Sequence, residues 1–383
     1  MKICFVSPIY PIKSDPRLGI FVHEQAKYLS KEGQEVCVLT LGRKDDGPYD
    51  VIDGVKIYRV RLYDLFLIKN FLLFHSVLTK LIALDRKYNF DIINSHFVGP
   101  LAGFVGIIAK SIGKPFIITP YGIGVVPKNK FNNMLTRIYL GFTSKIVCVS
   151  NYVAKLTSQY APKNKIIVIN LGVDAKKLQP KEDIKSFKRR LRLKNEKVLL
   201  SICGLVERKG IHIVLKSLPE VVRLHPKIKY FIIGKGPEKE RLKKLAKKLN
   251  LEKYVVFFDY VLPEDLANFY KICDIFVLMS KTIKEMSGVE GLGMVYLEAS
   301  YCGKPVIGGK SGGTGDAIVD GVTGYRIEPT NVKKLSETIL SLLRDDSLRK
   351  KLGTNGKKMV KTRFLGIHHA AKLTNVYKSL VDK

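Results

Sequence analysis

The sequence contains no tryptophan, only six cysteines among 383 residues, and 34 acidic side chains against 66 basic ones. The cysteines follow no short repeating spacing, which argues against a disulfide framework and against a zinc site. Cys4, Cys37 and Cys148 lie inside apolar runs that look like strands, so we expect buried free thiols. Free thiols are typical of a reducing compartment, and we therefore expect a cytoplasmic protein.

The sequence also lacks an uninterrupted apolar run long enough to cross a membrane. In the most apolar region, residues 62–88, the run is broken by Lys69, His75 and Lys80, whereas a span needs about 18 apolar residues. Two interpretations stay open: a helix packed on a sheet, or a helix whose apolar face dips into an anionic membrane from the cytoplasmic side. The start, MKICFVSPIY, reads as a first strand and lacks the charged-then-apolar pattern of a secretory signal.

The shortage of acidic residues gives the chain a formal net charge of +32. The first 170 residues already hold 23 basic and 11 acidic side chains, so the excess is not confined to a basic tail. An anionic membrane, a nucleic acid or a phosphorylated substrate would each suit such a charge. The basic runs at 185–194 and 239–249 place lysines opposite inward-facing leucines, without the interleaved aromatic residues that stack on bases. We therefore interpret them as solvated helix faces and expect no nucleic-acid partner.

What the chain does contain is an almost continuous alternation of short apolar runs and amphipathic segments. The strand-like runs are KICFVSP, EVCVLTL, VKIYRV, DIINSHF, PFIITP, KIVCVS and KIIVIN, followed by KVLLSICGL, KYFIIGKG, VVFFDYV, DIFVLMS, PVIGG and GYRIEP. Such alternation predicts an α/β fold with parallel sheets covered on both faces. We expect two doubly wound, Rossmann-like domains at residues 1–172 and 173–363, with a helix at about 364–383 that packs back on the first domain. In such domains a ligand binds at the carboxyl ends of the strands.

Residues 289–313, VEGLGMVYLEASYCGKPVIGGKSGG, combine a glycine-rich helix start with two glutamates. If 291–302 is a helix, its first turn offers unpaired N–H groups, which prefer phosphate or sugar oxygens. Gly291 and Gly293 would let a ligand approach that backbone closely. On one helix Glu290 and Glu298 would stand roughly 12 Å apart, too far for the carboxylate pair of a retaining glycosidase at about 5 Å. The spacing indicates two separate contacts with one long ligand, for example at a sugar and at a ribose.

Four further segments place polar or glycine residues at the predicted carboxyl ends of strands. GLVERKG (204–210) brings Arg208 and Lys209 beside the start of a helix, and KSGGTGD (310–316) supplies another turn. In the first domain Gly19 opens a helix after a long loop, and His96 ends the strand DIINSHF. Each feature alone is weak, because glycine turns and strand-end histidines are common. Together they favour one extended, phosphate-containing ligand.

These segments resemble the retaining GT-B glycosyltransferases of family 4. VEGLGMVYLEASYCGKPVIGGKSGG is similar to the family's E-x7-E donor-binding signature, and SPIYPIKSDPRLGIFVHEQAKYLSKEGQEVCVLT to its amino-terminal strand, loop and helix. DIINSHF, NLGVD, GLVERKG and DGVTGYRIEP resemble further blocks, so the resemblance covers nearly the whole chain. The segment VEGLGMVYLEA looks most like the corresponding segment of mannosyltransferases that modify lipid acceptors. The resemblance implies two Rossmann-like domains with a deep cleft between them.

The resemblance also implies roles for the matching residues of the second domain. Lys209 would neutralise the donor diphosphate with Arg208 beside it, and Glu290 would hold the transferred sugar. Glu298 would accept hydrogen bonds from the ribose hydroxyls. The main chain of the segment after Glu290 would hold the sugar hydroxyls, and we assign its residues to the donor site: Gly291, Leu292, Gly293, Met294 and Val295.

In the first domain, Gly19 would let its loop approach the phosphate, and His96 would face the transferred sugar. We therefore predict His96, Glu290 and Lys209 as the catalytic residues. Enzymes of this type retain the anomeric configuration, need neither a metal nor a cofactor, and close two domains over the donor. Two positions depart from the family pattern: Gly204 stands where an arginine is usual, and Tyr121 stands where a histidine is usual. The arginine position matters because a forked phosphate contact is not easily replaced.

We therefore expect a retaining glycosyltransferase that moves a hexose from a nucleotide diphosphate sugar, and the similarity of the motif to mannosyltransferases makes mannose the first candidate. The acceptor would be a glycan, a polyol or a lipid-linked molecule. Two alternatives stay open. One is a nucleotide-sugar epimerase or hydrolase on the same fold, and the other is a non-catalytic polyanion-binding protein.

Overall fold

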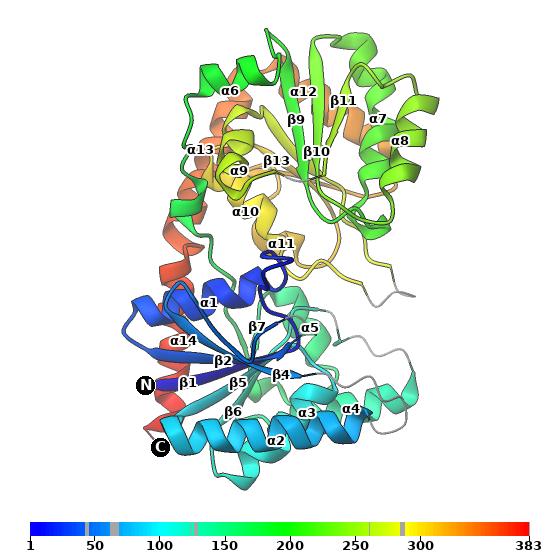
Figure 1. Cartoon of the computed structure of the whole chain (residues 1–383). Helices are drawn as coiled ribbons and strands as arrows, with labels where there is room; N and C mark the ends of the chain where they lie inside the picture. The colour runs from blue at the N-terminus through cyan, green and yellow to red at the C-terminus, as the bar shows by residue number, and fades with distance from the viewer. Residues whose placement is uncertain are drawn as a thin grey trace. The chain divides into compact units, whose positions relative to one another are not determined.

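The computed structural model describes residues 1–42, 46–61, 69–122, 124–125, 129–259, 261–283 and 288–382. The chain forms two compact α/β units, which are described separately. Unit 1 consists of Met1–Gly172 and Gly366–Lys383, and unit 2 of Val173–Leu365. Both contain a central sheet with helices on either face (Figure 1).

Unit 1 contains an eight-stranded sheet in the order β3-β4-β2-β1-β5-β6-β7-β8 within the described residues. All neighbouring strands are parallel except β3 and β4, which are antiparallel. The interior strands β1, β5 and β6 are buried on both faces along almost their whole length, and their amino-terminal halves are rich in Ile and Phe. The strands are β1 (Lys2–Ser7), β2 (Glu35–Gly42), β3 (Tyr49–Ile52), β4 (Val55–Arg61), β5 (Ile92–His96), β6 (Phe116–Thr119), β7 (Lys145–Cys148) and β8 (Ile166–Val168).

Helices α1 and α14 pack together on one face of this sheet, and α2, α3 and α4 lie side by side on the other (Figure 1). Gly366 at the start of α14 lies directly against the ring of Tyr28, where a Cβ would come within 2.2 Å of the ring. The C-terminal helix therefore belongs to unit 1. The helices are α1 (Ile20–Lys31), α2 (Lys69–Tyr88), α3 (Pro100–Ser111), α4 (Lys130–Gly141), α5 (Asn151–Thr157), η1 (Lys163–Lys165) and α14 (Gly366–Val381).

Helix α2 covers most of the apolar region for which two interpretations were open. Val77, Leu81 and Leu84 are buried, and the helix packs on α3 and β4, as the sheet-packing interpretation requires. Residues 62–68 lie outside the described residues. Among the helices that the structure describes, none is both long enough and apolar enough to cross a membrane.

Unit 2 contains a six-stranded parallel sheet, over its described residues, in the order β11-β10-β9-β12-β13-β14. Its strands are β9 (Lys197–Ile202), β10 (Ile228–Ile233), β11 (Val255–Phe258), β12 (Ile275–Leu278), β13 (Val306–Gly309) and β14 (Gly324–Ile327). Its helices are η2 (Ala175–Leu178), α6 (Ile184–Arg190), η3 (Glu207–Lys209), α7 (Ile211–Leu224), α8 (Lys239–Lys248), α9 (Pro263–Ile272), α10 (Met294–Tyr301), α11 (Thr314–Ala317), α12 (Val332–Arg344) and α13 (Asp346–Arg363).

The structure confirms every strand that the sequence predicted, and it adds β3. This short antiparallel strand alternates between exposed and half-buried residues, so it carries no apolar run. It joins β4 through Asp53 and Gly54, both with positive φ, which is the two-residue hairpin turn that Asp-Gly favours. The expected burial of Cys4, Cys37 and Cys148 is confirmed, and all six cysteines are free.

The basic runs lie on surface helices, as expected. On α8, Leu242 and Ala246 are buried while Lys243, Lys244 and Lys247 are exposed. These lysines therefore form a solvated helix face.

In each sheet the order of the strands reverses at one point, which fixes where a ligand can bind. In unit 2 the chain runs outward from β9 to β11 and then returns to the other side of β9 with β12. In unit 1 the same reversal separates β1 from β5. Open α/β sheets bind ligands outside the carboxyl ends of the strands at such a switch point. The loops after β9, β12, β1 and β5 are therefore where a site is expected.

Candidate active site

The loop after β9 brings Lys209 to the switch point of unit 2. Its short helix η3 ends at Gly210, which has a φ of 66° and begins α7. A Cβ at Gly210 would lie 2.0 Å from the carbonyl oxygen of Met279, at the end of β12, so only glycine allows this approach. The N–H of Lys281 donates to the carbonyl of Arg208 at 2.7 Å and ties the two loops together.

Glu290 lies on the loop after β12 and meets both basic residues of η3. Its Oε2 is 2.5 Å from Lys209 Nζ and 3.6 Å from the guanidinium of Arg208, and it accepts a hydrogen bond of 2.9 Å from Ser280 Oγ. The Glu290 residue is only 8% exposed. Burial alone would raise the pKa of Glu290, but Lys209, Arg208 and the hydrogen bonds together hold it below its usual value. The carboxylate is therefore ionised at neutral pH.

The KSGG turn after β13 fixes the backbone of Glu290. The N–H of Gly313 donates to the carbonyl of Glu290 at 2.7 Å. Gly312 has a φ of 58°, and a Cβ there would come within 2.4 Å of the same carbonyl oxygen. The loops after β9, β12 and β13 therefore converge on Glu290, the first two at its carboxylate and the third at its main-chain carbonyl.

Helix α10 begins later than the sequence suggested. The prediction was a helix over 291–302, whereas the structure has α10 at Met294–Tyr301 with Gly293 as its N-terminal cap at a φ of 87°. The ring of Tyr296 lies behind Gly293, where it would be 2.5 Å from an added Cβ. Because Glu290 precedes the helix, the estimate of 12 Å along one helix axis does not apply. The glycine at 293 turns the chain by adopting a left-handed conformation, which periodicity does not reveal.

The predicted donor-binding segment is accordingly a loop followed by a first helical turn. Leu292 is buried, so its side chain packs in the interior of unit 2. Gly291, Met294 and Val295 are half-buried. Glu298 is on α10, where the hydroxyl of Tyr270 from α9 donates to its Oε2 at 2.5 Å.

The remaining predicted residues lie at the switch point of unit 1. Gly19 begins α1 with a φ of 62°, and an added Cβ would lie 2.6 Å from the carbonyl oxygen of Ile9. His96 ends β5, is 1% exposed, and has its Nδ1 2.7 Å from the hydroxyl of Tyr121. Burial lowers the pKa of His96 to about 3, so its ring is neutral. The predicted residues thus form two groups, one in each unit.

Sequence reasoning missed Ser280 and Tyr270, which hydrogen-bond to the two glutamates. Ser280 is the last residue of the predicted strand DIFVLMS, so its position at a strand end was an available signal; Tyr270 lies within a helix and had none. The departure at Gly204 leaves an exposed position, where an added Cβ would have no heavy atom nearer than 3.9 Å. Within the described ranges, no group of three or more His, Cys, Asp or Glu side chains is placed to hold a metal ion.

Comparison with known proteins gives matches along both units. Residues 162–359 match the family described as glycosyl transferases group 1, and residues 18–177 match glycosyltransferase family 4. A GDP-mannose-dependent alpha-(1-6)-phosphatidylinositol monomannoside mannosyltransferase of Mycolicibacterium smegmatis is 32% identical over 214 residues, or 55% of this chain and 56% of that protein. The chain thus matches just over half the length of this relative.

Two solved structures share the GT-B fold with this chain. Sucrose-phosphate synthase from Thermosynechococcus elongatus has a TM-score of 0.80 at 20% identity, covering 100% of this chain and 99% of that one. Anabaena HepE, solved with UDP and glucose, has a TM-score of 0.81 at 18% identity, covering 99% of this chain and 100% of that one. At such identities the likeness establishes the fold, which confirms the expected GT-B class.

Proposed function

Because the chain belongs to the glycosyl transferases group 1 family, we propose that it is a retaining glycosyltransferase that takes a hexose from a nucleotide diphosphate sugar. The acceptor in this proposal is a glycan, a polyol or a lipid-linked molecule. The observation that carries the proposal is the buried contact between Lys209 and Glu290 at the carboxyl ends of β9 and β12. This is the position where a doubly wound sheet binds its ligand.

The proposed donor lies along the loop from Glu290 to the start of α10. A lysine ammonium has three hydrogen-bond donors, so Lys209 can bond Glu290 and still reach a phosphate oxygen. Arg208 adds a second positive charge beside it. The ionised Glu290 accepts hydrogen bonds from sugar hydroxyls, and Glu298, oriented by Tyr270, accepts them from the ribose. Main-chain N–H groups at the start of α10 face the electron-rich middle of the donor.

This arrangement suits cleavage of a glycosyl–phosphate bond. As the bond breaks, negative charge develops on the departing diphosphate and positive character on the sugar. Lys209, Arg208 and the helix-terminal N–H groups are already in place to stabilise the negative charge. In this proposal these groups do the work without a metal ion or cofactor, and Glu290 lies where the sugar becomes positive.

The donor can be identified by a thermal-shift screen of nucleotide diphosphate sugars. GDP-mannose and UDP-glucose are the first candidates, because the mycobacterial relative depends on GDP-mannose and the Anabaena structure contains UDP and glucose. A donor at 100 times its dissociation constant stabilises the folded state by about 2.7 kcal/mol. We expect one donor to raise Tm in the wild type and to lose this effect in Lys209→Ala and Glu290→Ala. Full transfer activity in Lys209→Ala and Glu298→Ala would contradict the assigned donor site.

The same preparation separates the two alternative functions. A nucleotide-sugar epimerase or hydrolase would convert the donor alone, and an epimerised or free sugar would then be the main product. A polyanion-binding protein would bind DNA or RNA with a steep dependence on salt, and Glu290→Ala would leave that binding unchanged. Transfer to an acceptor with retained anomeric configuration supports the proposal over both.

We further propose that unit 1 contacts an anionic membrane through helix α4. Phe131, Met134 and Ile138 follow the helical spacing i, i+3, i+7 and are 63%, 51% and 44% exposed. Lys130 and Arg137 are exposed on the same helix, so the apolar face carries positive charge beside it. An apolar stripe flanked by basic side chains is the pattern of a helix that lies in a membrane interface.

Co-sedimentation with vesicles tests this contact. We expect binding to vesicles that contain phosphatidylserine, a loss of at least several-fold in Phe131→Ser/Ile138→Ser, and weaker binding as salt rises. Equal binding of the wild type to neutral phosphatidylcholine vesicles would argue against the electrostatic part of the proposal. Unchanged binding of the double variant would show that α4 does not form the membrane contact.

A further inference from the structure

The neutral His96 ring has one nitrogen engaged and one without a partner. Nδ1 is 2.7 Å from the hydroxyl of Tyr121. Nε2 is buried and has no hydrogen-bond partner among the residues that the structure describes. A neutral imidazole donates through one nitrogen and accepts through the other, so the Tyr121 contact decides which role is left for Nε2.

The direction of that contact is set by Gln25 on helix α1. The amide nitrogen of Gln25 donates to the carbonyl of Phe21 at 2.9 Å and to the hydroxyl of Tyr121 at 2.7 Å. The Phe21 carbonyl can only accept, which places the nitrogen of the amide on this side. Tyr121 therefore accepts from Gln25, and its single proton is donated to Nδ1 of His96. His96 must then carry its own proton on Nε2.

His369 on α14 holds the other end of the Gln25 amide. Its Nε2 is 3.0 Å from Gln25 Oε1, and its Nδ1 is 2.9 Å from the carbonyl oxygen of Asn170. Burial, partly offset by the Asn170 carbonyl, lowers the pKa of His369 to about 4, so the ring is neutral at pH 7. The Asn170 carbonyl and Gln25 Oε1 both accept, and a neutral ring has a single proton for the two of them, so His369 does not decide the direction of the Gln25 amide. The Phe21 carbonyl decides it, and the C-terminal helix supplies the neighbour on the other side of the amide.

We propose that Tyr121 is a positioning residue that fixes the Nε2–H tautomer of His96, and that this N–H donates to an oxygen of the bound substrate. The inference rests on the proposed glycosyltransferase function and deepens it. It also gives a role to the tyrosine at a position where the family usually has a histidine. His96 lies at the switch point of the unit 1 sheet, where a ligand oxygen is expected.

The unsatisfied N–H supports a ligand partner. Buried donors are nearly always hydrogen-bonded, and an N–H that is held ready costs no reorganisation when an oxygen arrives. The opposite tautomer would present a lone pair, which repels a substrate oxygen that can only accept and would require a hydroxyl there to donate instead. Gln25, Tyr121 and His369 are each less than 9% exposed, so water does not readily exchange the proton positions.

The first test removes only the hydroxyl, in Tyr121→Phe. The rings of Phe21 and Phe97 lie 4.6 Å and 4.9 Å from the Tyr121 ring, and their packing is kept by the phenylalanine. Long-range proton–nitrogen NMR of the full chain labelled with ¹⁵N-histidine distinguishes the two tautomers by the shifts of the ring nitrogens. We expect His96 to be Nε2–H in the wild type and a mixture of tautomers in Tyr121→Phe.

Tyr377→Phe is the matched control. Tyr377 is another fully buried tyrosine of unit 1, and its hydroxyl accepts a hydrogen bond of 2.8 Å from Asn94 rather than contacting His96. We expect it to lower Tm comparably and to leave the His96 tautomer as in the wild type. A mixed tautomer in this control would show that loss of packing, not loss of the Tyr121 hydroxyl, frees the ring.

A second variant should reverse the tautomer. Gln25→Glu has nearly the same shape, but its carboxylate oxygens only accept, so Tyr121 would donate to residue 25 and accept from His96. We expect the His96 proton to move to Nδ1, and His369 to titrate at a higher pH beside the new carboxylate. If His96 stays Nε2–H in both Tyr121→Phe and Gln25→Glu, the proposal is overturned.

Kinetics with the donor and acceptor found by the screen complete the test. We expect kcat to fall roughly tenfold in Tyr121→Phe and further in Gln25→Glu, with the donor KM changed less than twofold. A tautomer change with an unaltered kcat would reject the substrate contact while leaving the transferase function intact. If the wild type transfers no sugar, the proposed function fails, whereas the NMR result still decides whether Tyr121 fixes the ring.

Discussion

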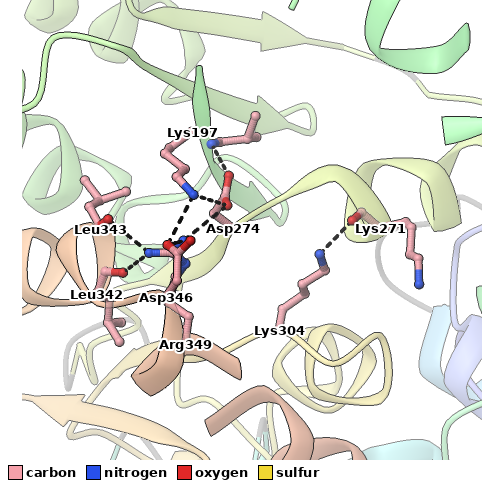
Figure 2. Close-up of polar contacts among 9 residues, drawn as sticks. Lys197, Lys271, Asp274, Lys304, Leu342, Leu343, Asp346 and Arg349 are labelled. Carbon is pink, nitrogen blue, oxygen red and sulfur yellow. Dashed lines mark hydrogen bonds and ion pairs between the residues drawn. The ribbon is translucent and has the colours of Figure 1, made fainter. Parts of the chain in front are cut away.

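Unit 2 carries two clusters of basic and acidic side chains at opposite ends of the same two strands. At the carboxyl ends of β9 and β12, Lys209 and Arg208 surround Glu290. At the amino ends of these strands, a second group surrounds Asp274, which we call the amino-end cluster: Lys197, Asp274, Asp346 and Arg349 (Figure 2). Glu290 and Arg349 are each 8% exposed, so burial does not distinguish the clusters.

The partners of the amino-end cluster are parts of the fold itself. Asp274 Oδ2 accepts from the N–H of Val198 at 2.8 Å, which joins the starts of β12 and β9. Figure 2 shows Arg349 of α13 reaching the carbonyls of Leu342 and Leu343 at the end of α12, the second of them at 3.0 Å. These contacts satisfy helix-end carbonyls that would otherwise have no partner. The cluster therefore fastens two strands to two helices.

The cluster at the carboxyl ends is built differently. Its charges lie on loops between a strand and a helix, beside the left-handed glycines Gly210 and Gly293 that begin α7 and α10. Helix N-termini and glycine turns leave main-chain N–H groups accessible to an anion. The amino-end cluster joins parts of the fold, whereas the charges around Glu290 lie at the end of the sheet where the proposed function places the donor.

The largest expected effect comes from removing charge at the carboxyl ends. In Glu290→Gln and Lys209→Ala we expect kcat to fall about 10²–10³-fold, because in the proposed function each of these groups stabilises charge in the transition state. Initial rates with the donor and acceptor from the screen measure this loss. The matched variant is Lys197→Ala, which removes a lysine from the amino-end cluster on the same strand. The kcat of Lys197→Ala should stay within twofold of the wild type. An equal loss of kcat in Lys197→Ala and Lys209→Ala would show that the two clusters do not differ in function.

The next effect concerns stability and lies at the amino ends. Arg349→Ala removes the side-chain partner of the Leu342 and Leu343 carbonyls and one of the two cations beside Asp274 and Asp346, so we expect a loss of about 2–4 kcal/mol in the free energy of unfolding. Urea titration followed by circular dichroism measures it. Arg344→Ala, an exposed arginine at the end of α12, is the control and should cost less than about 0.5 kcal/mol. A stable Arg349→Ala protein with impaired donor binding would assign the amino-end cluster to function instead.

Sequence periodicity was sufficient for the sheets, because buried parallel strands are continuous apolar runs. It missed β3, since an edge strand that is half in water, such as Tyr49–Ile52, has no such run. The Asp53-Gly54 turn was the available signal. The amino-end cluster was also invisible, because Asp274 and Arg349 are 75 positions apart and meet only through the order of the strands.

The candidate site could be predicted where a motif lies in one segment. Lys209 and Glu290 are 81 positions apart, yet both follow recognisable strands, so their meeting was expected from the fold class. The predicted start of α10 was wrong because the sequence does not distinguish Gly291 from Gly293, and only Gly293 adopts a left-handed conformation. The tautomer chain through Gln25 and His369 spans 344 positions and depends on hydrogen-bond directions that no residue pattern encodes.

A smaller effect should appear in the response to acid. Glu290 has a pKa below its unfolded value, so the stability it contributes is present above the ordinary glutamate pKa of about 4.3 and is lost as the pH falls through the folded pKa. The difference in the free energy of unfolding between the wild type and Glu290→Gln, measured by urea unfolding at pH 7, 5 and 3.5, should therefore become smaller toward low pH. A difference that grows as the pH falls would mean that the buried carboxylate is not held ionised by Lys209 and Arg208.

The smallest effect tests the family position that has no arginine. Gly204 follows β9, is exposed and does not have a positive φ, so Gly204→Arg should fold without strain. A guanidinium there can make a forked phosphate contact at the position where the family usually has an arginine, and we expect a two- to fivefold lower dissociation constant for the nucleoside diphosphate by calorimetry.

Gly141→Arg is the matched control for Gly204→Arg, because it adds the same charge in unit 1 at a glycine with no atom close to an added Cβ. Its diphosphate affinity should equal that of the wild type at 150 mM salt, where the Debye length is about 8 Å. If both variants gained affinity equally, the overall positive field would be responsible. If neither variant gained affinity, Arg208 would already supply the phosphate contact, and an arginine at position 204 would add nothing to the charges around Glu290.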